Sequence, residues 1–141
     1  MTLLVDTSVW SLAFRRDRPP DVPEVARLAA ALSGDEDVVA TGIIQLELLQ
    51  GFVPSRVQEM LEERFRVMRL VEPTRDDYLA AARLGRTCRQ SGVQLGVIDS
   101  LIAQLAIAHE LTLLTTDRDF THAATLIPLT LWVAPPSFSR K

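Results

Sequence analysis

The feature that most constrains the fold is an alternation of short apolar runs with longer segments of helical character. The apolar runs predict strands at 2–5, 37–40, 67–71, 112–115 and 129–133. Helical spacing, caps and stop signals predict helices at 7–14, up to Gly34, at 42–50, after Pro54, from Thr74 to about Ser91, and at 97–109. Such alternation favours an α/β fold, in which a short, mainly parallel sheet is flanked by helices.

The length and composition suit one compact domain. The chain has 141 residues, of which 48% are hydrophobic and 23% charged, a balance typical of folded soluble proteins. We expect the domain to cover residues 1–134 and a C-terminal tail to cover 135–141. The only cysteine, Cys88, predicts no intrachain disulfide. Because neither a signal peptide nor a membrane-spanning run is evident, we expect a cytoplasmic protein with no membrane partner.

The charge pattern gives a weak indication of a nucleic-acid partner. The net charge is -3, so the chain as a whole is not basic. Every basic residue except Lys141 is an arginine, and Arg83, Arg86 and Arg89 fall on one stripe of a predicted helix. Two interpretations stay open for this stripe: a solvated helix face, or a row of contacts to phosphate groups.

Three acids stand alone in apolar surroundings. Asp6 is the only charged side chain between residues 1 and 14, Glu47 the only one between 38 and 55, and Asp99 the only one between 91 and 109. Acidic side chains are rarely buried without a partner, and no basic residue lies near any of the three in sequence. We therefore expect these acids to lie at a cleft or to be neutralised by something other than a nearby side chain.

Two further acids follow a predicted strand. Asp117 and Asp119 come after the run that ends near Thr115, as Asp6 comes after the first strand. If these two strands are parallel neighbours, the acids reach one crevice at the carboxyl ends of the strands. Converging carboxylates repel one another unless a cation joins them. Oxygen ligands without a histidine or cysteine cluster predict Mg²⁺ or Mn²⁺ rather than zinc.

Each acid also has a structural interpretation. Asp6 is placed to cap the following helix, Asp99 to lie in the favourable first turn of a helix, and Asp117 to occupy a turn. The structural interpretation is weakest for Glu47, because it is isolated within a helix. For Asp119 the structural and the functional interpretations are evenly balanced. Ser8 is placed either to cap the helix or to hydrogen-bond a carboxylate or a metal-bound water.

Four segments together resemble the motifs of the VapC-type PIN domains. These segments are Val5-Asp6-Thr7-Ser8-Val9-Trp10, Glu47-Leu48-Leu49-Gln50-Gly51, Asp99-Ser100-Leu101-Ile102-Ala103 and Leu113-Leu114-Thr115-Thr116-Asp117-Arg118-Asp119-Phe120. Each motif is weak alone, but the four occur in the family's order and span nearly the whole chain. The resemblance implies a PIN-like, Rossmann-like fold with one acidic pocket.

The resemblance also implies an activity and its partners. A VapC-type toxin is an endoribonuclease that depends on Mg²⁺ or Mn²⁺, cleaves structured RNA such as tRNA or ribosomal RNA, forms a homodimer and is neutralised by a small antitoxin. By position, Asp6, Glu47, Asp99 and Asp117 would hold the metal. Asp119 would add to a second metal or orient a ligand, and Ser8 and Thr115 would support the ligands.

Two rival functions remain open. One is a metal-dependent phosphohydrolase of another doubly wound family. That class usually has a second acid two residues after the first, where this chain has Ser8. The other rival is a non-catalytic interaction domain with the PIN fold, which the complete set of acids disfavours.

Overall fold

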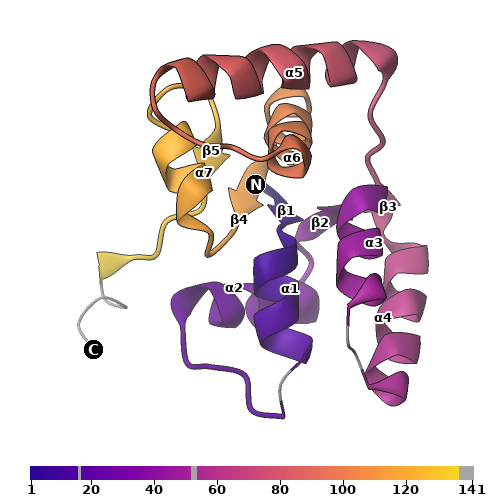
Figure 1. Ribbon diagram of the computed structural model, residues 1–141. Helices are drawn as coiled ribbons and strands as arrows, with labels where there is room; N and C mark the ends of the chain where they lie inside the picture. Colours follow the sequence, from indigo (N-terminus) through magenta and orange to yellow (C-terminus); the bar gives the residue numbers. More distant parts are fainter. Residues whose placement is uncertain (16, 52–53, 137–141) are drawn as a thin grey trace.

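The computed structural model describes residues 1–15, 17–51 and 54–136. Within them, the strands are β1 (Thr2–Val5), β2 (Asp37–Ala40), β3 (Arg69–Leu70), β4 (Thr112–Leu114) and β5 (Thr130–Leu131). The helices are α1 (Thr7–Phe14), α2 (Pro23–Ser33), α3 (Gly42–Gln50), α4 (Ser55–Val67), α5 (Arg75–Gln90), α6 (Val97–Ala108) and α7 (Arg118–Ala123). Figure 1 shows α5 lying across α6 at one end of the molecule, with α1 to α4 toward the other end.

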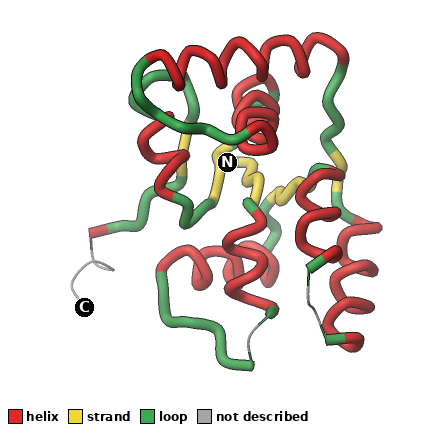
Figure 2. Tube along the Cα trace, viewed as in Figure 1, coloured by secondary structure: helices red, strands yellow, loops and turns green. Residues whose placement is uncertain are grey.

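The five strands form one sheet in the order β3-β2-β1-β4-β5, and all four pairings are parallel. The predicted α/β fold is therefore confirmed. The chain builds the sheet outward from β1, first toward β2 and β3 and later toward β4 and β5. The order thus reverses between β1 and β4, and ligand crevices in open α/β sheets lie at such a reversal. Figure 2 shows how short the strands are beside the helices that enclose them.

The core is built on the two central strands. Leu3, Leu4 and Val5 of β1 are fully buried, as are Leu113 and Leu114 of β4. Strands of parallel sheets carry apolar side chains on both faces because helices cover both faces. This is why the first strand reads as an unbroken apolar run that ends abruptly at an acid.

One predicted strand is shorter in the structure, and one short helix was not predicted. The strand predicted at 67–71 is only Arg69–Leu70, because α4 continues to Val67. Leu61 and Phe65 of that helix are both buried, and this i, i+4 spacing carries the helix past the point where the apolar letters suggested a strand. The short helix α7 was missed by the sequence analysis, since six residues are too few for a visible helical period.

The last predicted strand is also shorter in the structure. The strand expected at 129–133 is limited to Thr130–Leu131, although the Trp132 amide still donates to the Leu113 carbonyl at 2.9 Å. The helix predicted at 97–109 is α6 (Val97–Ala108), which exposes Val97 at its amino end to 87%. Residues 137–141 of the predicted tail lie outside the described residues.

Candidate metal centre

The site is built around the crevice between the two central strands. Asp6 directly follows β1, and Asp117 follows β4 by three residues. The Asp6 amide donates to the Leu114 carbonyl at 2.9 Å, which ties the end of β1 to the end of β4. The condition set by the sequence analysis, that these strands be parallel neighbours, is met.

Asp6 is buried and held by a network of hydroxyl groups. Only 5% of its surface is exposed. The Ser8 hydroxyl donates to its Oδ2 atom at 2.7 Å and the Thr115 hydroxyl donates to the same atom at 2.9 Å. The Ser8 amide also approaches Oδ2, at 3.4 Å, so Asp6 is the N-cap of α1. The described residues place no hydrogen bond on Oδ1, which leaves that oxygen available to a ligand.

Asp117 and Asp119 begin the short helix α7. Asp117 is its N-cap, and its Oδ1 atom accepts the Asp119 amide at 2.9 Å. The Asp117 amide donates to the Thr115 hydroxyl at 3.0 Å. Thr115 is therefore a bridge: it orients Asp6 on one side and the start of the Asp117 turn on the other. Asp117 is partly buried, whereas Asp119 is exposed.

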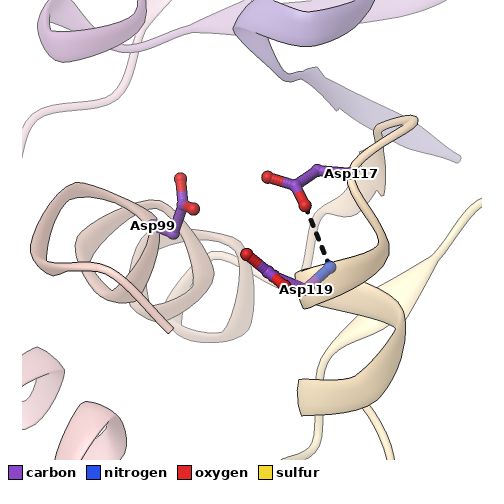
Figure 3. A group of neighbouring side chains, drawn as sticks. All are labelled: Asp99, Asp117 and Asp119. Carbon is purple, nitrogen blue, oxygen red and sulfur yellow. Dashed lines mark hydrogen bonds between the residues drawn. The ribbon is translucent and has the colours of Figure 1, made fainter. Parts of the chain in front are cut away.

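Asp99 faces these two acids from another helix. It lies in the first turn of α6, and carboxylate oxygens of Asp99, Asp117 and Asp119 lie within 4.8 Å of one another. Figure 3 shows the three side chains pointing into the space between α6 and α7. The packing of α6 and α7 thus brings Asp99 together with two acids that lie 18 and 20 positions further along the chain.

The pKa of Asp99 is raised in this environment. Burial, together with the negative charges of Asp6, Asp117, Glu47 and Asp119, raises the pKa of Asp99 from 3.8 to about 7. A helix amino terminus alone would lower the pKa of an acid in the first turn. Desolvation and like charges therefore outweigh the helix, and a bound cation would offset them by stabilising the charged carboxylate.

Glu47 is contributed by a further helix, α3. It lies in the middle of α3, and its Oε1 atom accepts the Thr7 hydroxyl at 2.9 Å. Asp6 and Glu47 are outside the group of three whose oxygens lie within 4.8 Å, but both charges act on Asp99. The structure thus brings all five predicted acids into one electrostatic neighbourhood, with Asp99, Asp117 and Asp119 closest together.

The composition of the cluster fits a hard divalent cation. The groups are all carboxylates, and the ion pairs recorded among the described residues, Arg27–Glu36 and Arg69–Asp37, lie elsewhere. Carboxylate oxygens are the preferred protein ligands of Mg²⁺ and Mn²⁺. The capping roles of Asp6 and Asp117 occupy one oxygen of each, so they do not compete with this interpretation.

One contact of the site was missed by the sequence analysis. Thr7 stands between Asp6 and Ser8 in the first motif, and its contact with Glu47 spans 40 positions of sequence. The residue itself was visible in the motif, but nothing in the sequence indicated its partner. Thr7 belongs to the network around the acids as much as Ser8 does.

An apolar hollow lies beside the acids rather than among them. Its volume is about 360 Å³, and it lies where α5 and α6 meet Ile43 of α3. Ile98 and Ser100, the neighbours of Asp99, line it, but no acid does. Arg86 and Arg89 of the predicted stripe are exposed at its border. This hollow is suited to apolar contacts and not to binding a cation.

Comparison of the sequence with models of known protein families identifies the family of this chain. A model of the PIN domain matches residues 3–126. The chain belongs to the PIN domain family. The acid cluster described above lies entirely within the matched residues. Comparison with curated protein sequences gives no match.

Solved structures give the same fold for this PIN domain. VapBC2 from Rickettsia felis superposes with a TM-score of 0.70 at 19% identity, covering 96% of this chain and 100% of that one. A toxin-antitoxin complex from Klebsiella pneumoniae gives a TM-score of 0.63 at 20% identity, with 84% and 89% covered. VapC20 from Mycobacterium tuberculosis gives 0.67 at 16% identity, with 94% and 99% covered.

These TM-scores establish a shared fold. The activity of a PIN-fold chain depends on the residues of its site. In the part of the chain that the structure describes, no helix is both long and apolar enough to cross a membrane.

Proposed function

We propose that this PIN domain is a metal-dependent endoribonuclease of the VapC toxin type. The observation that carries the proposal is the unpaired carboxylate cluster around Asp99, which lies at the reversal of strand order between β1 and β4. Like charges in partly buried positions repel one another and oppose folding, and a bound cation removes that repulsion. The donor set fits Mg²⁺ or Mn²⁺.

The residues have distinct roles in this proposal. Asp6, Glu47, Asp99 and Asp117 hold the cation, and Asp119 adds a ligand or orients a bound water. Ser8 and Thr115 fix Asp6 by donating to one of its oxygens, which leaves the other free. When bound, the cation supplies an activated water and stabilises the leaving oxygen of a phosphodiester.

RNA as the substrate is supported by one of the structural neighbours. VapC20 is described as a toxin that cleaves the sarcin-ricin loop. We infer that this chain also cuts structured cellular RNA, either tRNA or ribosomal RNA. The exposed Arg83, Arg86 and Arg89 are candidates for phosphate contacts, while a merely solvated face remains the alternative for that stripe.

The proposal includes two protein partners. A small antitoxin is supported by the likeness to a toxin-antitoxin complex. A homodimer is supported by the exposed apolar side chains beside the hollow, since Tyr78 is 57% and Val97 87% exposed. Light scattering of the purified protein tests the dimer: a monomer at all concentrations would contradict it. Localisation in the cytoplasm also stays a prediction.

The decisive experiment uses purified, antitoxin-free protein. It is incubated with total RNA and with Mg²⁺, Mn²⁺ or EDTA, and the new RNA ends are mapped by sequencing. We expect specific cuts with either metal and none with EDTA. A parallel assay with a small phosphomonoester tests the rival phosphohydrolase. Absence of both metal binding and cleavage would favour the non-catalytic interaction domain.

A further inference from the structure

Side-chain hydrogen bonds join α1 and its C-cap residue, Arg15, to α3 at two points, and both involve Glu47. At the amino end of α1, the Thr7 hydroxyl donates to Oε1 of Glu47 at 2.9 Å. At the carboxyl end, Nη2 of Arg15 donates to the main-chain carbonyl of Glu47 at 3.2 Å and to that of Leu48 at 2.7 Å. One helix therefore holds the side chain and the backbone of the same acid.

The Arg15 contact lies where α3 needs a partner. The helix ends at Gln50, so the carbonyls of Glu47 and Leu48 are among its last four carbonyl groups. These groups accept no hydrogen bond from an amide within the helix. A cation at this end also interacts favourably with the helix dipole. The Arg15 guanidinium thus fixes the last turn of the helix that carries Glu47.

Gly51 makes this contact possible. A Cβ atom at Gly51 would lie 2.3 Å from Nη2 and 2.8 Å from Cζ of Arg15. The φ angle of Gly51 is -73°, so the backbone conformation does not require glycine there. What requires glycine is space for the guanidinium. Because the atoms in the way are the far end of a flexible side chain, an added methyl group would displace Arg15 and leave the backbone in place.

We propose that Thr7 and Arg15 are positioning residues for Glu47, with Gly51 as the space that Arg15 needs. This inference rests on the proposed metal-dependent function. Thr7 holds one carboxylate oxygen and leaves Oε2 for a cation, as Ser8 and Thr115 do for Asp6. Arg15 holds the main chain from which the carboxylate extends.

Glu47 needs such support more than the other acids do. A glutamate has one more rotatable side-chain bond than an aspartate, so it loses more conformational freedom when it is fixed. It also lies outside the group formed by Asp99, Asp117 and Asp119. A preformed contact orients Glu47 before a cation arrives, and losing it weakens cation binding without removing a ligand.

The first test compares Thr7→Val with Thr7→Ser. Mn²⁺ binding to antitoxin-free protein is measured by electron paramagnetic resonance, which reads the metal without requiring activity. Valine keeps the shape but loses the hydroxyl, and we expect affinity to fall roughly tenfold. Serine keeps the hydroxyl and should restore most of the affinity. Thr2→Val is the matched control, since the Thr2 hydroxyl also donates to a carboxylate, that of Asp37, in an exposed contact away from the acid cluster.

The second test compares Arg15→Met with Gly51→Ala. Both remove the guanidinium from the carbonyls of α3, one by truncation and the other by displacement. We therefore expect similar losses of Mn²⁺ affinity, and a double variant no worse than Arg15→Met alone. Independent losses that multiply in the double variant would contradict the role given to Gly51. Metal-free thermal melts verify that each variant is folded.

The outcomes separate this inference from the proposed function. If the unmutated protein binds Mn²⁺ and cleaves RNA while Thr7→Val and Arg15→Met bind Mn²⁺ equally well, the positioning roles are wrong and the function stands. If the Thr7→Val loss persists in a Glu47→Gln background, Thr7 does not act through Glu47. If the unmutated protein neither binds Mn²⁺ nor cleaves RNA, the proposed function fails and this inference fails with it.

Discussion

Two acids occupy the same position on two helices that pack together, and they have opposite environments. Asp77 is the third residue of α5, and Asp99 is the third residue of α6. The Thr74 amide, at 2.9 Å, and Gln104 Nε2, at 3.2 Å, both donate to Asp77, and the Thr74 amide holds the pKa of Asp77 below its usual value. The described residues offer Asp99 no such donor.

The difference teaches how to separate a structural acid from a functional one. Both side chains lie at a helix amino terminus, so the helix dipole does not distinguish them. Asp77 is compensated within the chain, which makes it part of the fold. Asp99 is surrounded by other acids, and its raised pKa shows that the chain leaves it uncompensated. Among the described residues, donors compensate the charge of Asp77, whereas Asp99 is surrounded by acids, so a cation would stabilise its charged form.

The strongest test of the difference between Asp99 and Asp77 is to neutralise each acid and measure RNA cleavage. Asp99→Asn should lose at least about 100-fold in cleavage rate, because the proposed site loses a charged ligand while the fold is kept. Asp77→Asn should cleave nearly as fast as the unmutated protein at a temperature where it is folded. His122→Ala is the control for an exposed change on α7. Equal losses for the two asparagine variants would end the distinction.

Metal binding should separate the same two variants by stability. At a Mn²⁺ concentration 100 times the dissociation constant, a ligand that binds only the folded state stabilises it by about 2.7 kcal/mol. We expect that increase for the unmutated protein and for Asp77→Asn, and a much smaller one for Asp99→Asn. Denaturant unfolding with Mn²⁺ or EDTA measures it. An equal increase in all three would show that the metal binds elsewhere.

Without metal, Asp77→Asn should be less stable than Asp99→Asn. Asp77→Asn removes a charged acceptor from a buried capping box, so unfolding free energy should fall by about 1–3 kcal/mol. Asp99→Asn removes repulsion from four acids, so its stability should be unchanged or higher. Urea denaturation in EDTA compares the three proteins. A large destabilisation by Asp99→Asn would show that Asp99 is a structural residue after all.

The pH dependence of metal-free stability should also separate the two acids. The folded-state pKa of Asp99 is raised from 3.8 to about 7, so its contribution is present below about pH 4 and is lost as the pH rises to 7. The pKa of Asp77 is lowered, so its contribution is present above its usual pKa of 3.8 and is lost as the pH falls further. Asp99→Asn should flatten the stability curve between pH 4 and 7, and Asp77→Asn should flatten it only below pH 4. Unchanged curves would contradict the assigned environments.

Local signals in the sequence determined much of this protein. The helix start at Thr74 was readable because the partner that caps it, Asp77, lies only three residues along the chain. The strand ending at Asp6 was readable because a central parallel strand is apolar throughout. The isolation of Asp6, Glu47 and Asp99 in apolar runs identified the acids, since such positions are unfavourable for a charge without a partner.

Only the tertiary structure decided how those acids meet. The order of the strands places Asp6 beside the end of β4, and helix packing brings Asp99 to Asp117 and Asp119. The contacts of Thr7 and Arg15 with α3 span more than 30 residues, so no periodicity or cap signal records them. Sequence patterns report which side chain is out of place in its own segment. They do not report the neighbour that compensates for it, because that neighbour is set by how the segments pack.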